Sequence, residues 1–211
     1  MIRHVDARLC GDHRWYLAES RAFFATRAAT WDTRFGDDLP AYAAAVADAG
    51  IPHGATVVDV GCGTGRALPA LRDAVGPDGT VIGVDITPEM LGVARAARAS
   101  TGAGLLLADA RRLPLSARAV VAVFAAGLVN HLPDVPAGLT ELARITRPGG
   151  RLAIFHPSGR AALAARHGRV LQHDEPLVQA QLTALLTGNG WRLDSYDDAP
   201  DRFLALAIRT G

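Results

Sequence analysis

Short apolar runs alternate with amphipathic stretches through the middle of the chain. Buried strands are predicted for the runs rich in Val, Leu and Ala near residues 56–61, 80–85, 104–108, 119–125 and 151–155. Helices are predicted between them, where apolar residues recur at helical spacing, near 64–75, 88–101 and 135–147. This alternation predicts an α/β domain with a parallel sheet, right-handed crossovers and helices on both faces.

The last third of the chain has a different rhythm. A helix is predicted near 176–188, and it ends at a Gly-Asn-Gly turn. Two strands follow near 191–197 and 202–209, with only four residues between them. Four residues cannot form the crossover that two parallel strands need, so the pair is predicted to be an antiparallel hairpin.

The first fifty residues fall outside the strand and helix alternation. Helices are predicted for Arg14–Thr30 and Leu39–Gly50, and aromatic side chains are concentrated around them. These rings either seal the edge of the core or form a lid over a bound ligand. With 211 residues the chain is expected to form one domain, in which 1–50 are a helical cap and 51–211 the core.

Residues 57–66 contain the most informative motif. An apolar strand carrying Asp59 runs into Gly61, Gly63 and Gly65, where backbone without side chains can approach a ligand closely. The next strand ends at Asp85, an acidic residue of the type that accepts hydrogen bonds from the two hydroxyls of a ribose. The two strands together predict a pocket for a nucleoside-containing cofactor.

The glycine spacing distinguishes between nucleoside cofactors. A dinucleotide fingerprint needs a third glycine where this chain has Arg66, and an acid two residues before Gly61 suits an amino group better than a pyrophosphate. The pattern Asp59-x-Gly61-x-Gly63-x-Gly65 resembles motif I of the class I S-adenosylmethionine-dependent methyltransferases, in the type 11 group that modifies small molecules. The resemblance covers roughly residues 55–211. It implies a single Rossmann-like, doubly wound sheet of seven strands in the order 3-2-1-4-5-7-6, with strand 7 antiparallel.

The resemblance also implies a set of cofactor contacts. S-adenosyl-L-methionine is the implied cofactor and S-adenosyl-L-homocysteine the product. The implied cofactor-binding residues lie in the cap, in the glycine turn and after the following strands: Trp31, Asp59, Gly61, Cys62, Gly63, Gly65, Asp85, Ile86, Asp109, Ala110, Ala125 and Ala126.

Individual roles follow for the acidic residues. Asp85 is expected to bind the ribose hydroxyls, and Asp109 the exocyclic amine of adenine. Asp59 is expected to hold the amides of the glycine turn and, through them, the amino group of the cofactor. Arg66 is expected to face solvent rather than the cofactor carboxylate.

Two histidines follow adjacent strands at the same edge of the predicted sheet. His131 and His156 are candidate catalytic residues, because an imidazole can act as a general base near neutral pH. Two histidines without a clear third carboxylate ligand do not indicate a metal site, so no metal is predicted. A third possibility is that one of them only orders its loop.

Composition excludes several classes of protein. The formal net charge is +1, which argues against a nucleic-acid partner, and no apolar run approaches the length of roughly 20 residues needed to span a membrane. The chain has no lysine, so a Walker A loop, a pyridoxal enzyme and a protein kinase are excluded. Cys10 and Cys62 are far apart, and a disulfide at the glycine turn would obstruct the site, which favours a reduced, cytoplasmic setting.

The predicted function is in-line methyl transfer to a small-molecule acceptor. The segment near 157–175 is too short for a large substrate domain. Two alternatives stay open, a non-catalytic S-adenosyl-binding module and an NAD(P)-dependent oxidoreductase, while the oligomeric state is left undetermined. The basic residues outside the motif could bind a substrate carboxylate or phosphate, but exposed faces are the expected place for them: Arg111, Arg112, Arg160, Arg166, His167 and Arg169.

Overall fold

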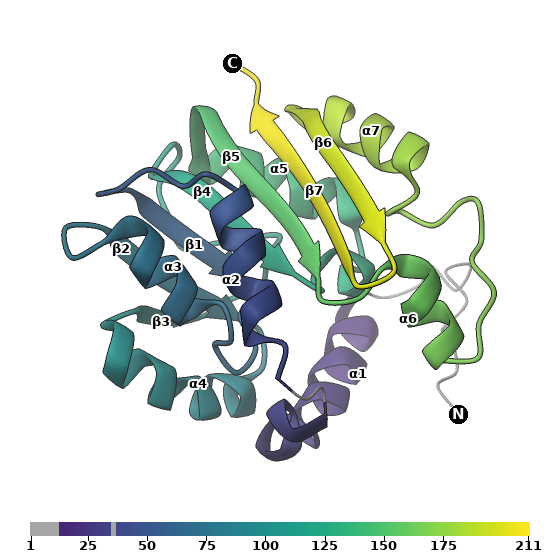
Figure 1. Ribbon diagram of the computed structural model, residues 1–211, viewed down its shortest axis with the longest axis horizontal. Helices are drawn as coiled ribbons and strands as arrows, with labels where there is room; N and C mark the ends of the chain where they lie inside the picture. The colour runs from purple at the N-terminus through teal and green to yellow at the C-terminus, as the bar shows by residue number, and fades with distance from the viewer. Residues whose placement is uncertain (1–12, 35–36) are drawn as a thin grey trace.

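The computed structural model describes residues 13–34 and 37–211. In this part of the chain, seven strands form one sheet in the order β3-β2-β1-β4-β5-β7-β6 (Figure 1). The strands are β1 (Thr56–Val60), β2 (Thr80–Asp85), β3 (Gly104–Leu107), β4 (Val120–Ala126), β5 (Thr146–His156), β6 (Trp191–Ala199) and β7 (Arg202–Arg209). Neighbours from β3 to β5 pair in parallel, and β7 runs antiparallel to both β5 and β6. The strand order and the antiparallel strand predicted by the family resemblance are confirmed.

Helices cover both faces of the sheet, so the described part of the chain has three layers (Figure 1). The helices are α1 (His13–Ala25), α2 (Leu39–Asp48), α3 (Leu68–Val75), α4 (Pro88–Thr101), α5 (Val135–Ile145), α6 (Arg160–Arg166) and α7 (Gln179–Gly188). Short 3-10 helices are η1 (Ala28–Thr30), η2 (Asp32–Arg34) and η3 (Val129–His131). In Figure 1, α2 and α3 lie on one face of the sheet, and α5 on the opposite face.

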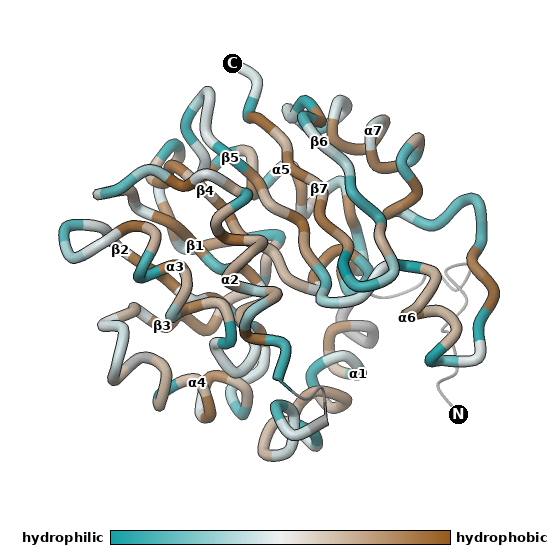
Figure 2. Tube along the Cα trace, viewed as in Figure 1, coloured by the Kyte–Doolittle hydropathy of each residue, from teal (hydrophilic) through white to brown (hydrophobic). Residues whose placement is uncertain are grey.

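Each face of the sheet has its own buried cluster. Leu139 and Leu142 of α5 pack with Leu182 of α7 against the inner strands. On the other face, Val46 of α2 and Leu71 of α3 pack against β1, β4 and β5. In Figure 2 the most hydrophobic positions lie along these strands and the hydrophilic ones gather in the loops. This burial of both faces explains why the strand sequences are almost continuously apolar.

The α2 helix belongs partly to this core. Ala45 is fully buried and Val46 is 2% exposed, although both fall in the segment that was predicted to be a cap. The division into a cap at 1–50 and a core at 51–211 stays a prediction.

Several elements differ from the sequence prediction. The helix expected over 14–30 ends at Ala25, and the one expected over 176–188 begins at Gln179. The helix expected from residue 64 begins at Leu68, because Gly63 and Gly65 have φ angles of +53° and +88° and the turn continues to Ala67. The strand expected from residue 151 begins at Thr146, directly after α5, and its pairing with β4 is irregular near that end. The helix α6 is absent from the sequence prediction, and it lies within the segment 157–175, for which no element is predicted.

Trp191 anchors the hairpin to α5. The indole is 1% exposed, and its Nε1–H donates a hydrogen bond to the carbonyl oxygen of Leu139 over 3.0 Å. Trp191→Phe leaves a cavity and a buried carbonyl without its donor, so we expect the free energy of unfolding to fall by about 2 kcal/mol. Urea denaturation of the variant measures this loss. The control is Arg192→Ala, at a side chain 62% exposed, which we expect to change the same quantity by less than about 0.5 kcal/mol.

Candidate functional site

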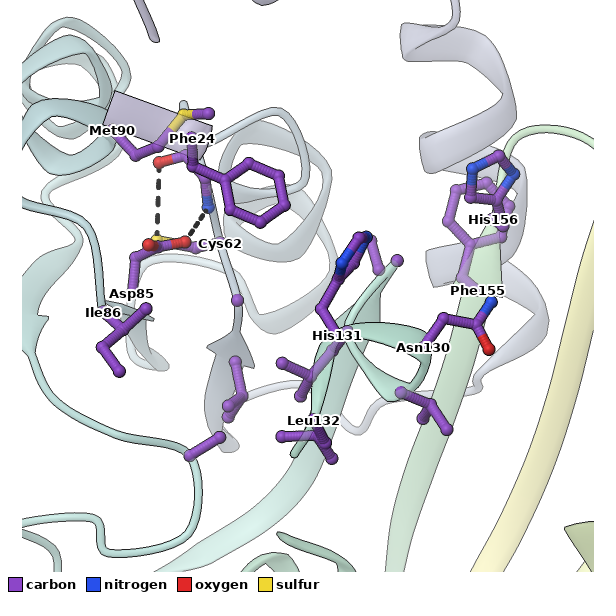
Figure 3. Close-up of a pocket in the computed structure, with 18 of the residues that line it drawn as sticks. Phe24, Cys62, Asp85, Ile86, Met90, Asn130, His131, Leu132, Phe155 and His156 are labelled. Carbon is purple, nitrogen blue, oxygen red and sulfur yellow. Dashed lines mark hydrogen bonds between the residues drawn. The ribbon is translucent and has the colours of Figure 1, made fainter. Parts of the chain in front are cut away.

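The carboxyl ends of the parallel strands open into a cavity of about 480 Å³. It lies where the strand order reverses between β1 and β4, the position at which open α/β sheets bind their ligands. Figure 3 shows Asp85, Ile86, Cys62 and Met90 on one side of this cavity and His156 on the other. His131 lies between the two groups in that view.

The glycine turn is held by the end of β2. The amides of Gly61 and Cys62 donate to the carbonyl oxygen of Val84 over 2.8 and 2.9 Å, and the amide of Gly63 donates to Asp85 Oδ2 over 2.9 Å. The expectation that Asp59 holds these amides is therefore wrong. Val84 and Asp85 accept them instead, because β2 extends past β1 and its end lies beside the turn.

The three glycines of the motif have different structural roles, since two line the cavity and one allows close packing of the helices. A Cβ atom at Gly63 would enter open space, so its backbone faces the cavity without a side chain in the way. A Cβ at Gly65 would lie 3.0 Å from Leu68 and 3.2 Å from Ala97, and Gly65 does not line the cavity. Gly65 is therefore required for packing between the turn and the helices α3 and α4, whereas Gly61 and Gly63 line the site.

Asp85 is fixed at the floor of the cavity. Its Oδ1 accepts the amide of Thr87 over 2.8 Å, while Oδ2 accepts the amide of Gly63. Burial raises the pKa of Asp85, and these two backbone donors oppose the shift by stabilising the carboxylate. Each oxygen still has a lone pair for a further donor.

The carboxylate of Asp59 is buried in the site, where its charged form is unfavourable. It is 1% exposed, it lines the cavity, and its Oδ1 has no hydrogen-bond partner among the described residues. Burial raises the pKa of Asp59 to about 8, and the neighbouring Asp85 adds to the shift. A cationic group bound in the cavity would stabilise its charged form.

The turn after β3 brings Asp109 and Ala110 to the cavity wall, together with Ile86 from the turn after β2. Arg111 holds the carboxylate of Asp109, with Nη2 and Oδ2 2.7 Å apart. Burial alone would raise the pKa of Asp109, but the hydrogen bonds from Arg111 outweigh it and the pKa is lowered. The prediction that Arg111 is a solvated charge is wrong, since its side chain is only 17% exposed.

Ala125 and Ala126, which were both expected to contact the cofactor, have side chains on opposite faces of β4. Ala126 lines the cavity, whereas Ala125 is fully buried in the core beneath α5. Successive side chains of a strand point to opposite faces, so Ala125 and Ala126 have different environments. The structure thus corrects the prediction for Ala125.

The segment before β1 forms a roof over the cavity. Leu17, Phe23 and Phe24 of α1 line it together with Trp31. The Phe24 ring contacts Trp31 edge-on at 5.4 Å between centroids and contacts His131 at 5.1 Å. Trp31 therefore lies in the wall, as predicted, and Phe24 links the roof to the end of β4.

An ion-pair network fastens this roof to the glycine turn. Arg66 Nε donates to Asp38 Oδ1 over 2.8 Å, and Arg66 Nη1 donates to Asp32 Oδ1 over 3.0 Å. The hydroxyl of Thr64 also donates to Asp32 Oδ1, over 2.6 Å. The side chain of Arg66 is 9% exposed, so the prediction that it faces solvent is wrong.

His131 and His156 both line the cavity, as their positions after β4 and β5 predicted. Burial lowers the pKa of His131, and His156 lowers it further. Burial also lowers the pKa of His156. The Nδ1 atom of His156 lies 3.1 Å from the amide nitrogen and 3.0 Å from the carbonyl oxygen of Ser158, which fixes the ring. Both imidazoles are therefore neutral near pH 7.

The basic residues of α6 and its surroundings are not simply an exposed face. Arg160 is 12% exposed, and its guanidinium lies 3.3 Å from Asp198 and 3.7 Å from Glu175. Arg160 and His167 line the cavity, while Arg169 pairs with Glu175. The expectation of a solvated cluster is wrong for Arg160, because the hairpin and the segment before α7 cover it.

Several lining residues had no recognisable signal in the sequence. Asp38, Tyr42, Thr64, Met90 and Phe203 belong to four different parts of the chain, and only the fold brings them to one cavity. Among the described residues, no group of three His, Cys, Asp or Glu side chains is placed to hold a metal ion. No described helix has both the length and the apolar character of a membrane span.

The fold and the site together define an α/β domain that binds a nucleoside-containing cofactor. One acidic residue lies before its glycine turn and another at the end of β2. Over part of its length the chain is similar to the class I S-adenosylmethionine-dependent methyltransferases. Residues 58–154 match the family model for the methyltransferase domain, whose cofactor is S-adenosyl-L-methionine. That range includes the glycine turn, Asp85, Asp109 and His131.

Relatives with known names share the same part of the chain. The arsenite methyltransferase of Halobacterium salinarum is 39% identical over 109 residues, which are 50% of this chain and 28% of that protein. The demethylmenaquinone methyltransferase of Shouchella clausii is 35% identical over 111 residues, 51% of this chain and 47% of that protein. The match thus spans less than half the length of these relatives.

A solved structure supports the fold over a larger share of the chain. The magnesium protoporphyrin IX methyltransferase of Synechocystis, solved with bound S-adenosylhomocysteine, superposes with a TM-score of 0.67. The superposition covers 92% of this chain and 100% of that chain at 19% sequence identity. At this identity the likeness establishes the shared fold.

The residues present fit S-adenosyl-L-methionine. The unpartnered, buried carboxylate of Asp59 suits a cationic amino group, and the open space beside Gly63 admits a ligand against the backbone. Asp85 retains acceptor capacity for hydroxyl groups, and the cavity continues from it to Ala110 and Ile86.

The raised pKa of Asp59 predicts a pH dependence of stability in the ligand-free protein. Between about pH 4 and pH 8 the native state keeps a proton that the unfolded chain has lost, so the free energy of unfolding falls as pH rises, by up to about 1.4 kcal/mol per pH unit. Asp59→Asn removes this contribution. Urea denaturation at pH 5.5, 6.5 and 7.5 should show the variant gaining stability relative to the wild type with each step. Parallel pH curves for the two proteins would contradict a raised pKa, and the exposed Asp73→Asn serves as the control.

The network around Arg66 predicts a second effect. Arg66→Ala leaves the partly buried carboxylate of Asp38 without its cation and frees the roof from the glycine turn, so we expect local opening to increase about tenfold or more. The rate of limited trypsin cleavage between η1 and α2 measures that opening. Arg95→Ala, at an exposed arginine of α4, should cleave at the wild-type rate. Equal rates for all three proteins would show that the network does not hold the roof.

Proposed function

We propose that this protein transfers the methyl group of S-adenosyl-L-methionine to a small-molecule acceptor. One observation carries the proposal: the glycine turn and Asp85 open into the same cavity as His131 and His156. A cofactor held by the first group would place its methyl group toward the second. The names of the matched relatives, which include arsenite and demethylmenaquinone methyltransferases, support a small acceptor.

Each cofactor-binding role is assigned to groups that line the cavity. Asp85 binds the ribose hydroxyls, because its carboxylate is fixed by two backbone amides and keeps free lone pairs. Ile86 and Ala110 pack against the base, and Asp109 accepts its exocyclic amine while paired with Arg111. Asp59 compensates the charge of the amino group, in place of its expected role on the turn amides.

The remaining contacts are shaped by the backbone and the roof. Gly61, Cys62 and Gly63 let the cofactor approach the turn, and Ala126 packs at its methionine end. Trp31 covers the site from the roof, where an aromatic face suits a sulfonium cation. Gly65 and Ala125 support these contacts through packing, since neither lines the cavity.

The bound cofactor supplies an activated methyl group, so the protein's own residues mainly orient the acceptor and exclude water. His131 and His156 are the candidate general bases for an acceptor that arrives protonated. Both are neutral near pH 7 because burial lowers the pKa of each imidazole, and neutral imidazole is the form that accepts a proton. Phe24 holds the His131 ring edge-on, and the backbone of Ser158 holds His156.

The two alternatives fit the site less well. A non-catalytic binding module needs no cavity beyond the cofactor, yet this one continues to Leu163, Leu177 and Phe203. A nicotinamide-dependent oxidoreductase needs a small residue at the position of Arg66, whose side chain instead bridges Asp32 and Asp38. The buried, free thiol of Cys62 accords with the proposed reduced, cytoplasmic setting.

The test is calorimetric titration with S-adenosylhomocysteine, with NADH as the control ligand. We expect micromolar binding of S-adenosylhomocysteine alone. Asp85→Ala should weaken that binding about 100-fold or more, because the variant loses both the charge-assisted contacts to the ribose and the anchor for the amide of Gly63. Asp78→Ala removes the same charge from an exposed turn and should bind as the wild type does. Unchanged affinity in Asp85→Ala would overturn the cofactor assignment.

A further inference from the structure

Charged groups next to the strand ends of the cavity wall are separated by strand order. Three further charged residues line the cavity from the roof and the glycine turn, and they are Arg27, Asp38 and Arg66. Asp109, Asp85 and Asp59 come from the ends of β3, β2 and β1, which form one half of the sheet. Basic groups of the wall follow β4 and β5 on the other half, and they are His131, His156, Arg160 and His167. Figure 3 shows this separation, with Asp85 at one side of the cavity and His156 at the other.

The histidine half offers no unpaired carboxylate among the described lining residues. The charge of Asp38 raises the pKa of His156, but Arg66 pairs with that carboxylate. Arg166 and His167 act on His156 in the opposite sense. The carboxylates that pair with Arg160 do not line the cavity, so its guanidinium separates them from a ligand.

The wall between these polar groups is apolar. Ile154 and Phe203 come from the adjacent strands β5 and β7, Leu163 from α6, and Leu177 from the segment before α7. Leu132 and Pro157 complete the apolar surface beside the two histidines. A ligand here is surrounded mostly by hydrocarbon and aromatic rings, and it meets hydrogen-bond partners at two imidazoles and at the amide of Asn130 (Figure 3).

The ring nitrogens define what those imidazoles can bind. Nδ1 of His156 is engaged with the backbone of Ser158, and Nε2 has no partner among the described residues. In the tautomer with Nδ1–H donating to the carbonyl oxygen of Ser158, Nε2 keeps its lone pair. It then accepts a hydrogen bond from a hydroxyl group, or stands beside the resulting oxyanion once it has taken the proton. A protonated amine would be buried beside basic groups without a counter-charge, which is strongly unfavourable.

We infer that the acceptor is an apolar molecule with an acidic hydroxyl, of the phenol or enol class, and not a cationic amine. This inference rests on the proposed function and names the substrate class for it. In the reaction, the hydroxyl oxygen forms a bond to the methyl carbon while the bond from that carbon to sulfur breaks, and the sulfur keeps the electron pair. The hydroxyl proton goes to His131 or His156, so the products are a methyl ether, neutral S-adenosylhomocysteine and an imidazolium.

The first experiment measures binding to the protein saturated with S-adenosylhomocysteine. The probes are 2-naphthol, 2-naphthoate and 2-naphthylmethylammonium, which share one apolar ring system and differ in their polar group. Ligand-observed NMR titration at pH 7 should show that 2-naphthol binds at least about tenfold more tightly than the ammonium compound. Equal or tighter binding of the ammonium compound would overturn the inference, and so would the absence of naphthol binding.

A matched pair of variants locates the probe. Leu163→Arg places a long cationic side chain in the apolar wall, whereas Ala161→Arg adds the same side chain to an exposed position of the same helix. We expect Leu163→Arg to weaken 2-naphthol binding at least about tenfold and to leave S-adenosylhomocysteine affinity within twofold. Ala161→Arg should change neither affinity. Loss of naphthol affinity in both variants, or in neither, would show that the probe binds elsewhere.

Turnover with S-adenosyl-L-methionine then tests the chemistry. We expect 2-methoxynaphthalene from the wild type, and a loss of at least about tenfold in kcat for His131→Ala or His156→Ala that shrinks as pH approaches the pKa of the naphthol. Binding without any product would overturn the placement of the hydroxyl at the histidines. If S-adenosylhomocysteine itself fails to bind, the proposed function fails, whereas S-adenosylhomocysteine binding without naphthol binding overturns only the acceptor class.

Discussion

The site depends on the way the end of β2 holds the glycine turn after β1. Three consecutive amides, from Gly61 to Gly63, are accepted by the carbonyl of Val84 and the carboxylate of Asp85. These bonds fix a turn that has no regular structure of its own and that runs through three positive φ angles before α3 begins. Because Asp85 is itself held by Thr87, the same side chain supports the protein backbone and faces the ligand. A change at this residue therefore affects both the turn and the contact.

This arrangement has an electrostatic consequence. Asp59 and Asp85 are both buried at one cavity, and Asp59 is left without a hydrogen-bond partner among the described residues. A buried acid in this position opposes folding while it is charged, which is why burial raises the pKa of Asp59 to about 8. Apolar residues would stabilise the empty domain better. A ligand that carries positive charge explains why Asp59 and Asp85 occupy these positions.

The sheet and the glycine turn could be predicted from the sequence because they depend on local patterns. Apolar runs of strand length and the hairpin after residue 190 are each contained in a short window, and the family motif supplies the strand order. The roles of Arg66 and Arg160 could not be predicted, because each depends on a neighbour far away in the sequence. Arg66 meets Asp38 across the roof, and Arg160 meets Asp198 from the hairpin. Burial of a charged side chain by a distant segment leaves no mark in the residues around it.

The division of charge along the sheet also bears on the direction of the proposed reaction. The acids follow the strands on one side of the switch point and the histidines follow those on the other side, so the two halves of the cavity stabilise different charges. Before transfer the positive charge belongs to the donor sulfur, nearest the half that contains Asp59 and Asp85. After transfer it is a proton on a histidine, in the half lined by neutral bases. Since burial favours the neutral imidazole, that proton is readily released to solvent once the roof opens. The strand order thus places the groups that stabilise the sulfonium charge and the groups that accept the proton in different halves of the cavity. No single residue has to do both.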